Sequence, residues 1–190
     1  SIQFVEPVQN NEVWKNIETY ILSKRPDIEL RVYGHYSQEC DLSFLQYVPS
    51  TTSFLADCLT DCKNIDKISL LPKLKKLSIG VFNISSFDFL NDISKKLTHL
   101  SIGETKSTSI DVSNIKEFQN LESFYNDGMK KGLENIKHLN QLKKITLRGV
   151  KLPDLNFLSE LKKIEILRLL YGSYKNLDSL SQLKSLKELE

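Results

Sequence analysis

The sequence predicts an α/β solenoid. We expect a right-handed β-α superhelix with short parallel β-strands on its concave face and short helical or 3₁₀ segments on its convex face. Two observations predict this fold. A motif recurs at intervals of 24, 23, 23, 24, 21, 22 and 22 residues, and each copy joins an apolar/polar alternation to a run with an apolar residue at every third position. Neither half can bury its apolar side alone, but stacked copies share one continuous core.

The alternating half of each copy predicts a strand. The clearest pair is Leu77-Ser78-Ile79-Gly80, which recurs 23 residues later as Leu100-Ser101-Ile102-Gly103. Alternation places successive side chains on opposite faces of a strand, so the apolar residues point inward. The first inward residues of the expected strands are Leu30, Phe54, Leu77, Leu100, Phe124, Ile145, Leu167 and Leu189.

The other half of each copy predicts a short helical segment. Apolar residues recur with period three, which fits one face of a short helix or a 3₁₀ turn. In the sixth copy they are Leu152, Leu155, Leu158, Leu161 and Ile164.

Residues 158–169 carry the pattern L-x-x-L-x-x-L/I-x-x-L-x-L in full. The chain thereby resembles leucine-rich repeat proteins, in particular the bacterial type with repeats of about 22 residues. The resemblance covers residues 27–190, with about seven repeats and the start of an eighth. It implies a non-catalytic scaffold that binds a partner protein on its concave sheet. The family's turn asparagine is largely missing here, and Thr105 is the only residue at that position able to replace it.

Residues 1–26 lie outside the repeat and are expected to form an N-terminal capping segment with one amphipathic helix. Asn10 or Asn11 can cap a helix of about 11–23, Pro26 ends it, and residues 2–5 can add a short strand. A helix that binds a partner is the alternative. No such cap follows Leu189, so we expect the natural chain to continue beyond residue 190. The alternative is a native end covered by self-association; otherwise the protein is expected to be a monomer.

Composition excludes several classes of function. The chain has 190 residues, 40% of them hydrophobic, and its net charge is only +2, which argues against nucleic acid as a partner. No run of 18 apolar residues is present, so no membrane span and no membrane partner are expected. An odd number of cysteines is not a disulfide framework and favours a reducing, cytoplasmic location.

We expect no enzyme activity, no metal and no cofactor. Cys58 and Cys62 have the spacing of a zinc pair, and Cys40 and His35 are the only plausible additions, so free thiols are favoured over a metal site. The histidines His35, His99 and His138 are not expected to converge on a catalytic group. Five Lys-Lys pairs mixed with acidic residues indicate a solvated surface more than a nucleic-acid stripe.

The strand frame names the side chains that point outward on the concave face. Tyr and Arg often dominate the energy of protein interfaces, which favours a patch of Tyr125, Arg148 and Arg168; the alternative is that these are ordinary solvent-facing residues. A targeting domain of a larger enzyme or effector and a small-molecule or peptide receptor are the alternative functions. The candidate partner-binding residues are Arg31, Tyr33, His99, Tyr125, Asp127, Arg148, Arg168 and Leu170.

Overall fold

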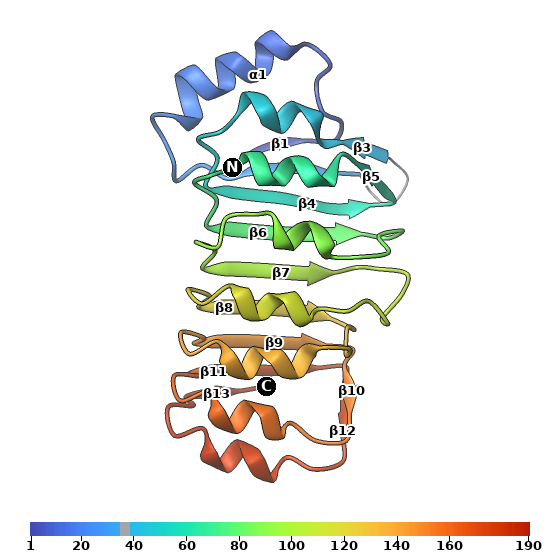
Figure 1. The fold of residues 1–190 in the computed structure, drawn as a ribbon, viewed down its shortest axis with the longest axis vertical. Helices are drawn as coiled ribbons and strands as arrows, with labels where there is room; N and C mark the ends of the chain where they lie inside the picture. Colours follow the sequence, from blue (N-terminus) through green and yellow to red (C-terminus); the bar gives the residue numbers. More distant parts are fainter. Residues whose placement is uncertain (35–38) are drawn as a thin grey trace.

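The computed structural model describes residues 1–34 and 39–190, which form an elongated stack of coils (Figure 1). One parallel sheet of nine strands runs along the stack, and its spatial order follows the chain order. This confirms the predicted leucine-rich repeat solenoid. The strands are β1 (Ile2–Phe4), β2 (Leu30–Tyr33), β4 (Ser53–Leu59), β6 (Lys76–Val81), β7 (His99–Gly103), β8 (Ser123–Asp127), β9 (Lys144–Arg148), β11 (Ile166–Leu170) and β13 (Glu188–Leu189).

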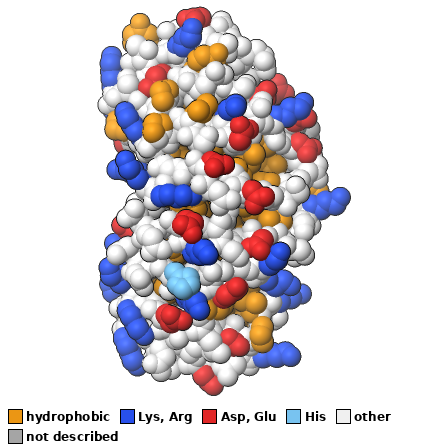
Figure 2. All heavy atoms as spheres, viewed as in Figure 1, with side chains coloured by type: hydrophobic (Ala, Val, Ile, Leu, Met, Phe, Trp, Pro, Cys, Tyr) orange, Lys and Arg blue, Asp and Glu red, His pale blue; other side chains and the backbone are white. Residues whose placement is uncertain are grey.

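Short 3₁₀ segments cover the other face of the sheet, as the period-three leucines predict. Figure 2 shows this side of the molecule, where Lys and Arg side chains lie among Asp and Glu side chains. The 3₁₀ segments are η2 (Leu42–Tyr47), η3 (Ile65–Leu70), η4 (Asp88–Asn91), η5 (Ser113–Glu117), η6 (Leu133–His138), η7 (Asn156–Glu160) and η8 (Asp178–Gln182).

The core lies between the sheet and these 3₁₀ segments. Inward strand residues such as Leu100, Ile102 and Leu147 are at most 2% exposed. Inward residues of neighbouring strands are register partners, so each coil packs its apolar residues on those of the next, as Leu77 and Leu100 do. The burial of this apolar surface is the main stabilising contribution.

The N-terminal segment starts its helix at the predicted place, but the helix changes type along its length. The side chain of Asn10 accepts a hydrogen bond from the backbone N–H of Glu12 and starts α1 (Asn11–Ile17), and a π-helical turn, η1 (Glu18–Leu22), follows it. Helical structure thus spans residues 11–22, close to the predicted 11–23, and its second part is π-helical. Trp14 is fully buried and stacks on Phe44 with ring centroids 4.1 Å apart, while β1 pairs with β2.

Asn126 occupies a strand position at which the repeat pattern predicts an inward apolar residue, and its side chain hydrogen-bonds the backbone of the following turn. Asn126 is fully buried, and its Nδ2 donates a hydrogen bond to the carbonyl oxygen of Met129 at 2.8 Å. Thr105, at the expected turn position, donates from its hydroxyl to the carbonyl of Ser107 at 2.7 Å. Both side chains thus donate hydrogen bonds to backbone carbonyls of turns, but they lie at different positions of the repeat.

Two small parallel pairs at the ends of the coils were not predicted. They are β3 (Glu39–Asp41) with β5 (Asp61–Lys63), and β10 (Lys151–Leu152) with β12 (Ser173–Tyr174). The first pair places Cys40 directly opposite Cys62, and all three cysteines are free thiols, as expected. His35, considered above as a metal ligand, lies outside the described residues.

Candidate partner-binding surface

The strand register arranges the outward side chains of the sheet in three rows. The central row runs through Arg31, Leu55, Ser78, Ser101, Tyr125, Thr146 and Arg168. The first row, where the strands begin, contains Ser53, Lys76, His99, Ser123, Lys144 and Ile166. The last row, where the strands end, contains Tyr33, Asp57, Gly80, Gly103, Asp127, Arg148 and Leu170; β4 is irregular beyond Ala56.

All eight predicted residues lie on this outward face, but the structure divides them into groups. Arg31 and Tyr33 are on β2, whereas Arg168 and Leu170 are on β11, six strand positions away. At a spacing of about 4.8 Å between strands, the two groups are roughly 29 Å apart. His99 lies between them on β7. One small ligand therefore cannot contact both ends of the predicted set.

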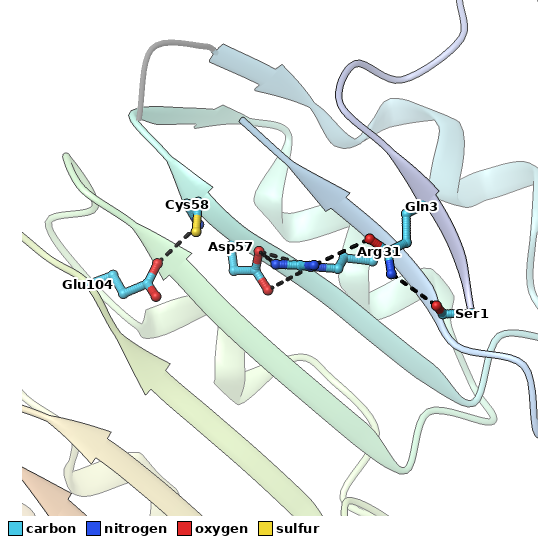
Figure 3. A network of polar contacts seen from close by, with 6 residues as sticks. All are labelled: Ser1, Gln3, Arg31, Asp57, Cys58 and Glu104. Carbon is cyan, nitrogen blue, oxygen red and sulfur yellow. Dashed lines mark hydrogen bonds and ion pairs between the residues drawn. The ribbon is translucent and has the colours of Figure 1, made fainter. Parts of the chain in front are cut away.

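The β2 group is a closed polar cluster (Figure 3). Arg31 contacts the Asp57 carboxylate at 2.7 Å, lies 3.3 Å from Oε1 of Gln3, and has its guanidinium carbon 4.7 Å from the ring centre of Tyr33. The hydrogen bond with Asp57 raises the pKa of Arg31 above its usual value. Arg31 and Asp57 thus neutralise each other within the protein.

Glu104 is a residue of this surface that sequence reasoning missed. It follows β7 with a positive φ of 56°, and its carboxylate accepts a hydrogen bond from the backbone N–H of Cys58 at 3.0 Å (Figure 3). A Cβ built on Gly80 would collide with this carboxylate, so the glycine leaves the space that Glu104 occupies. The paired glycines Gly80 and Gly103 were the available sequence signal, because they leave the end of the sheet open to a neighbouring side chain.

The C-terminal group contains the predicted patch. Arg148 contacts the Asp127 carboxylate at 2.7 Å, and its guanidinium lies 5.4 Å from the ring centre of Tyr171, which is 82% exposed. Partial burial, followed by the charge of Asp127, raises the pKa of Tyr125, so its hydroxyl stays protonated. The structure therefore brings together Tyr125, Asp127 and Arg148.

Arg168, the third residue of the predicted patch, is held on its other side. Its guanidinium contacts Glu188 at 2.6 Å and Glu190 at 3.1 Å, both beyond β11 in the stack. Arg168 is thus turned toward the C-terminal coil, while Arg148 is turned back toward β8.

A shallow hollow of about 230 Å³ lies over β6, β7 and β8 in the middle of the concave face. Its floor is made by small residues because Ser78 and Ser101 occupy the central row, where Leu55 and Tyr125 stand on either side. Partial burial and the charges of Lys76 and Lys144 lower the pKa of His99, so its ring is mostly neutral at pH 7. The lining residues are Glu29, Ser53, Leu55, Lys76, Leu77, Ser78, His99, Leu100, Ser101, Ser123 and Tyr125.

The described residues contain no group of three or more His, Cys, Asp or Glu side chains placed to hold a metal ion. Within those same ranges, no helix combines the length and the apolar character needed to cross a bilayer.

The stacked coils, parallel sheet and period-three 3₁₀ segments define a leucine-rich repeat fold. Comparison with solved structures supports this class. An internalin (inlF) from Listeria monocytogenes superposes with a TM-score of 0.65 at 17% identity, covering 88% of this chain and 55% of that one. A leucine-rich repeat protein of Leptospira interrogans gives 0.59 at 18% identity, covering 99% and 54%.

A plant protein also shares the fold. The ectodomain of the Arabidopsis thaliana membrane receptor kinase GASSHO1/SCHENGEN3, solved in complex with CASPARIAN STRIP INTEGRITY FACTOR 2, gives a TM-score of 0.58 at 16% identity. The match covers 84% of this chain and 21% of that one, so the chain spans about half or less of all three neighbours. At these identities the likeness concerns the fold. No protein-family model and no curated protein match the sequence.

Proposed function

We propose that this protein is a non-catalytic protein–protein interaction scaffold that binds a partner protein on its concave sheet surface. The observation that carries the proposal is the unbroken run of seven strands from β2 to β11, whose outward side chains form a continuous central row from Arg31 to Arg168. Stacked coils hold such a surface in one shape, so little conformational entropy is lost when a partner binds.

The chemistry of the outward residues supports a protein partner. Tyr125, Arg148 and the exposed Tyr171 offer large side chains of the types that contribute most to interface energy. We propose the eight predicted residues, Arg31, Tyr33, His99, Tyr125, Asp127, Arg148, Arg168 and Leu170, as contacts of an extended partner. A span of roughly 29 Å suits a protein partner better than a small molecule.

The plant neighbour supports a binding role, because it was solved in complex with CASPARIAN STRIP INTEGRITY FACTOR 2. The two bacterial neighbours favour a bacterial origin. Residues 1–26 are proposed to cap the repeats of residues 27–190, which the full burial of Trp14 against Phe44 supports. The three free thiols favour a cytoplasmic location.

One alternative function has an observation in its favour. The central hollow of about 230 Å³ could hold a small molecule or the side chains of a short peptide, which is the receptor alternative. A small-molecule receptor should gain several degrees of melting temperature in a screen of metabolites, because a ligand that binds only the native state stabilises it. An interaction scaffold should show no such gain.

The test of the proposed function is affinity capture from lysate of the native cells. The wild-type protein would be compared with the triple variant Tyr125→Ala, Arg148→Glu, Arg168→Glu. We expect one protein to be captured at least tenfold more by the wild type, since aromatic and arginine contacts in an interface often contribute 2 kcal/mol or more each.

A matched control carries the same kinds of change away from the concave face: Tyr20→Ala, Lys116→Glu and Lys137→Glu. All three proteins must have the same melting temperature within 2 °C, an acceptance limit of about 0.5 kcal/mol for a domain of this size. Capture lost equally in the control, or retained in the concave variant, would contradict a concave binding surface.

A further inference from the structure

The charged groups of the last row are already satisfied inside the protein. Arg31 contacts Asp57, and Arg148 contacts Asp127, both at 2.7 Å. Glu104 accepts the backbone N–H of Cys58. A partner that met these groups would have to compete with existing interactions, so this row contributes shape more than uncompensated charge.

The donors around the central hollow are not satisfied in this way. Lys76 and Lys144 make no ion pair or hydrogen bond through their side chains with any of the described residues. The hydroxyls of Ser78, Ser101 and Ser123 likewise have no side-chain hydrogen bond within residues 1–34 and 39–190. Lys76, Ser78, Ser101 and Ser123 therefore line the hollow with hydrogen-bonding capacity that no described residue uses, and Lys144 stands beside Ser123 on the next strand.

Two acidic groups lie near the hollow, and one of them pairs with a cation. Glu29 accepts a hydrogen bond from the hydroxyl of Ser53 at 3.2 Å, and Glu122 contacts Lys143 at 3.0 Å. Two exposed lysines, Lys75 directly before β6 and Lys96 three residues before β7 begins, add positive charge at the strand-start edge. Lys75, Lys76, Lys96, Lys143 and Lys144 outnumber Glu29 and Glu122 around the hollow, so the local charge is positive, although the net charge of the whole chain is only +2.

The spacing of the donors sets the shape of a complementary ligand. Lys76, His99, Ser123 and Lys144 are consecutive partners along the first row. Three strand steps separate the two lysines, which is about 14 Å. An extended peptide rises about 3.4 Å per residue, so acidic side chains at positions i and i+4 match the distance between Lys76 and Lys144.

We infer that the central hollow is a docking site for an extended acidic segment of a partner protein, whose Asp or Glu carboxylates pair with Lys76 and Lys144 and accept hydrogen bonds from Ser78, Ser101 and Ser123. This inference rests on the proposed function, since it names the chemistry of the partner on the same concave face. Charge-assisted hydrogen bonds to carboxylates are stronger than neutral ones, which favours an acidic segment over a polar neutral one.

The direct test uses a fluorescein-labelled peptide, Glu-Gly-Glu-Gly-Glu, and its control, Gln-Gly-Gln-Gly-Gln, in fluorescence anisotropy titrations at 50 mM salt. We expect the acidic peptide to bind at least tenfold more tightly than the neutral one. The double variant Lys76→Gln, Lys144→Gln should weaken binding of the acidic peptide at least fivefold. The control Lys116→Gln, which removes an exposed lysine from the convex face, should change it less than twofold.

Several results would overturn the inference. These are equal binding of the two peptides, no binding of either at 1 mM peptide, or an equal loss in Lys116→Gln. A ten-residue oligothymidine that binds more tightly than the acidic peptide through the same two lysines would also overturn it, because the site would then suit nucleic acid.

The failure of this inference can be told apart from failure of the proposed function. A captured partner that binds the Lys76→Gln, Lys144→Gln variant as tightly as the wild type, but is lost in the Tyr125, Arg148 and Arg168 variant, refutes the acidic docking site and leaves the scaffold role intact. Loss of the same partner in the lysine variant supports the docking site.

Discussion

The first and last rows of the concave sheet face the same solvent but differ in how their charges are used. In the last row, Asp57 pairs with Arg31 of the central row, and Asp127 pairs with Arg148. In the first row, Lys76 and Lys144 have no such partner among the described residues. An outward position on the sheet therefore does not by itself make a side chain available for binding.

The difference arises from which residue types the register places side by side. On β8 and β9 it sets Asp127 directly beside Arg148, and on β2 and β4 it sets Tyr33 beside Asp57 with Arg31 in reach. In the first row it sets Lys76 beside His99 and Ser123 beside Lys144, so no carboxylate stands next to either lysine in that row. We therefore expect the ion pairs of the last row to contribute more to stability, and the unpaired lysines of the first row to contribute more to recognition of a partner's charge.

The largest expected loss of stability comes from the buried core residues beneath both rows. Leu147 is fully buried on β9 between the outward residues Thr146 and Arg148. Leu147→Ala should lower the free energy of unfolding by about 2–5 kcal/mol, because it removes core contacts and leaves a cavity. Leu169→Ala, at the equivalent but only half-buried position of β11, should cost less. Urea unfolding measures both, and equal small losses would refute the strand frame.

The next largest effect on stability compares a tightly packed position of the last row, Gly103, with an open position of the central row, Ser101. A Cβ added at Gly103 would lie 2.5 Å from the Cβ of Asp127, so Gly103→Ala must displace the residue that holds Arg148. We expect a loss of about 1–3 kcal/mol from overpacking. Ser101→Ala, two residues earlier on the same strand, should change stability by less than about 0.5 kcal/mol. Equal effects in thermal and urea unfolding would remove the distinction between the rows.

A smaller effect separates paired from unpaired charge. The side chains of Arg31 and Asp57 are 28% and 14% exposed, and Asp57→Asn should cost about 1 kcal/mol, the usual size of a lost hydrogen bond. Lys76→Gln should be neutral within about 0.5 kcal/mol, as for other surface changes. The measurement is the urea midpoint of each variant at constant m-value. A larger loss for Lys76→Gln would show that the first row also stabilises the fold.

The smallest effect concerns His99, whose pKa is lowered by partial burial and then by the charges of Lys76 and Lys144. Lys144→Gln should raise the pKa of His99, and Lys116→Gln should leave it unchanged; imidazole NMR titration measures both.

The sign of the pH dependence follows from this direction. The unfolded chain takes up the His99 proton more readily than the folded one, so the contribution of His99 to stability is full above about pH 6.5 and falls as the pH is lowered. A rise in stability on going from pH 7 to pH 5.5 that disappears in His99→Gln would contradict it.

The sequence predicted the solenoid because its leucines repeat in register, and one side of every strand can be assigned from alternation alone. It could not predict Glu104, since that side chain lies over Gly80 only after a turn with positive φ brings it back across the sheet. The π-helical turn of residues 18–22 likewise depends on tertiary contacts. So does the register of β3 and β5, which places the free thiols of Cys40 and Cys62 opposite each other.

The candidate site was predicted in part for the same reason. Alternation places Arg31, Arg148 and Arg168 outward, but which carboxylate each contacts depends on the register between coils. The hollow depends on Ser78 and Ser101 lying side by side between Leu55 and Tyr125, which one strand considered alone does not reveal.

Site-directed photocrosslinking tests most directly whether a partner protein binds the concave sheet. A benzophenone amino acid would replace Ser101 in the centre of that face and, in a second protein, Gln119 on the opposite side. After irradiation in lysate of the native cells, we expect one crosslinked protein at position 101 and none at position 119. Crosslinking of that protein only at position 119, or equally at both positions, would contradict it.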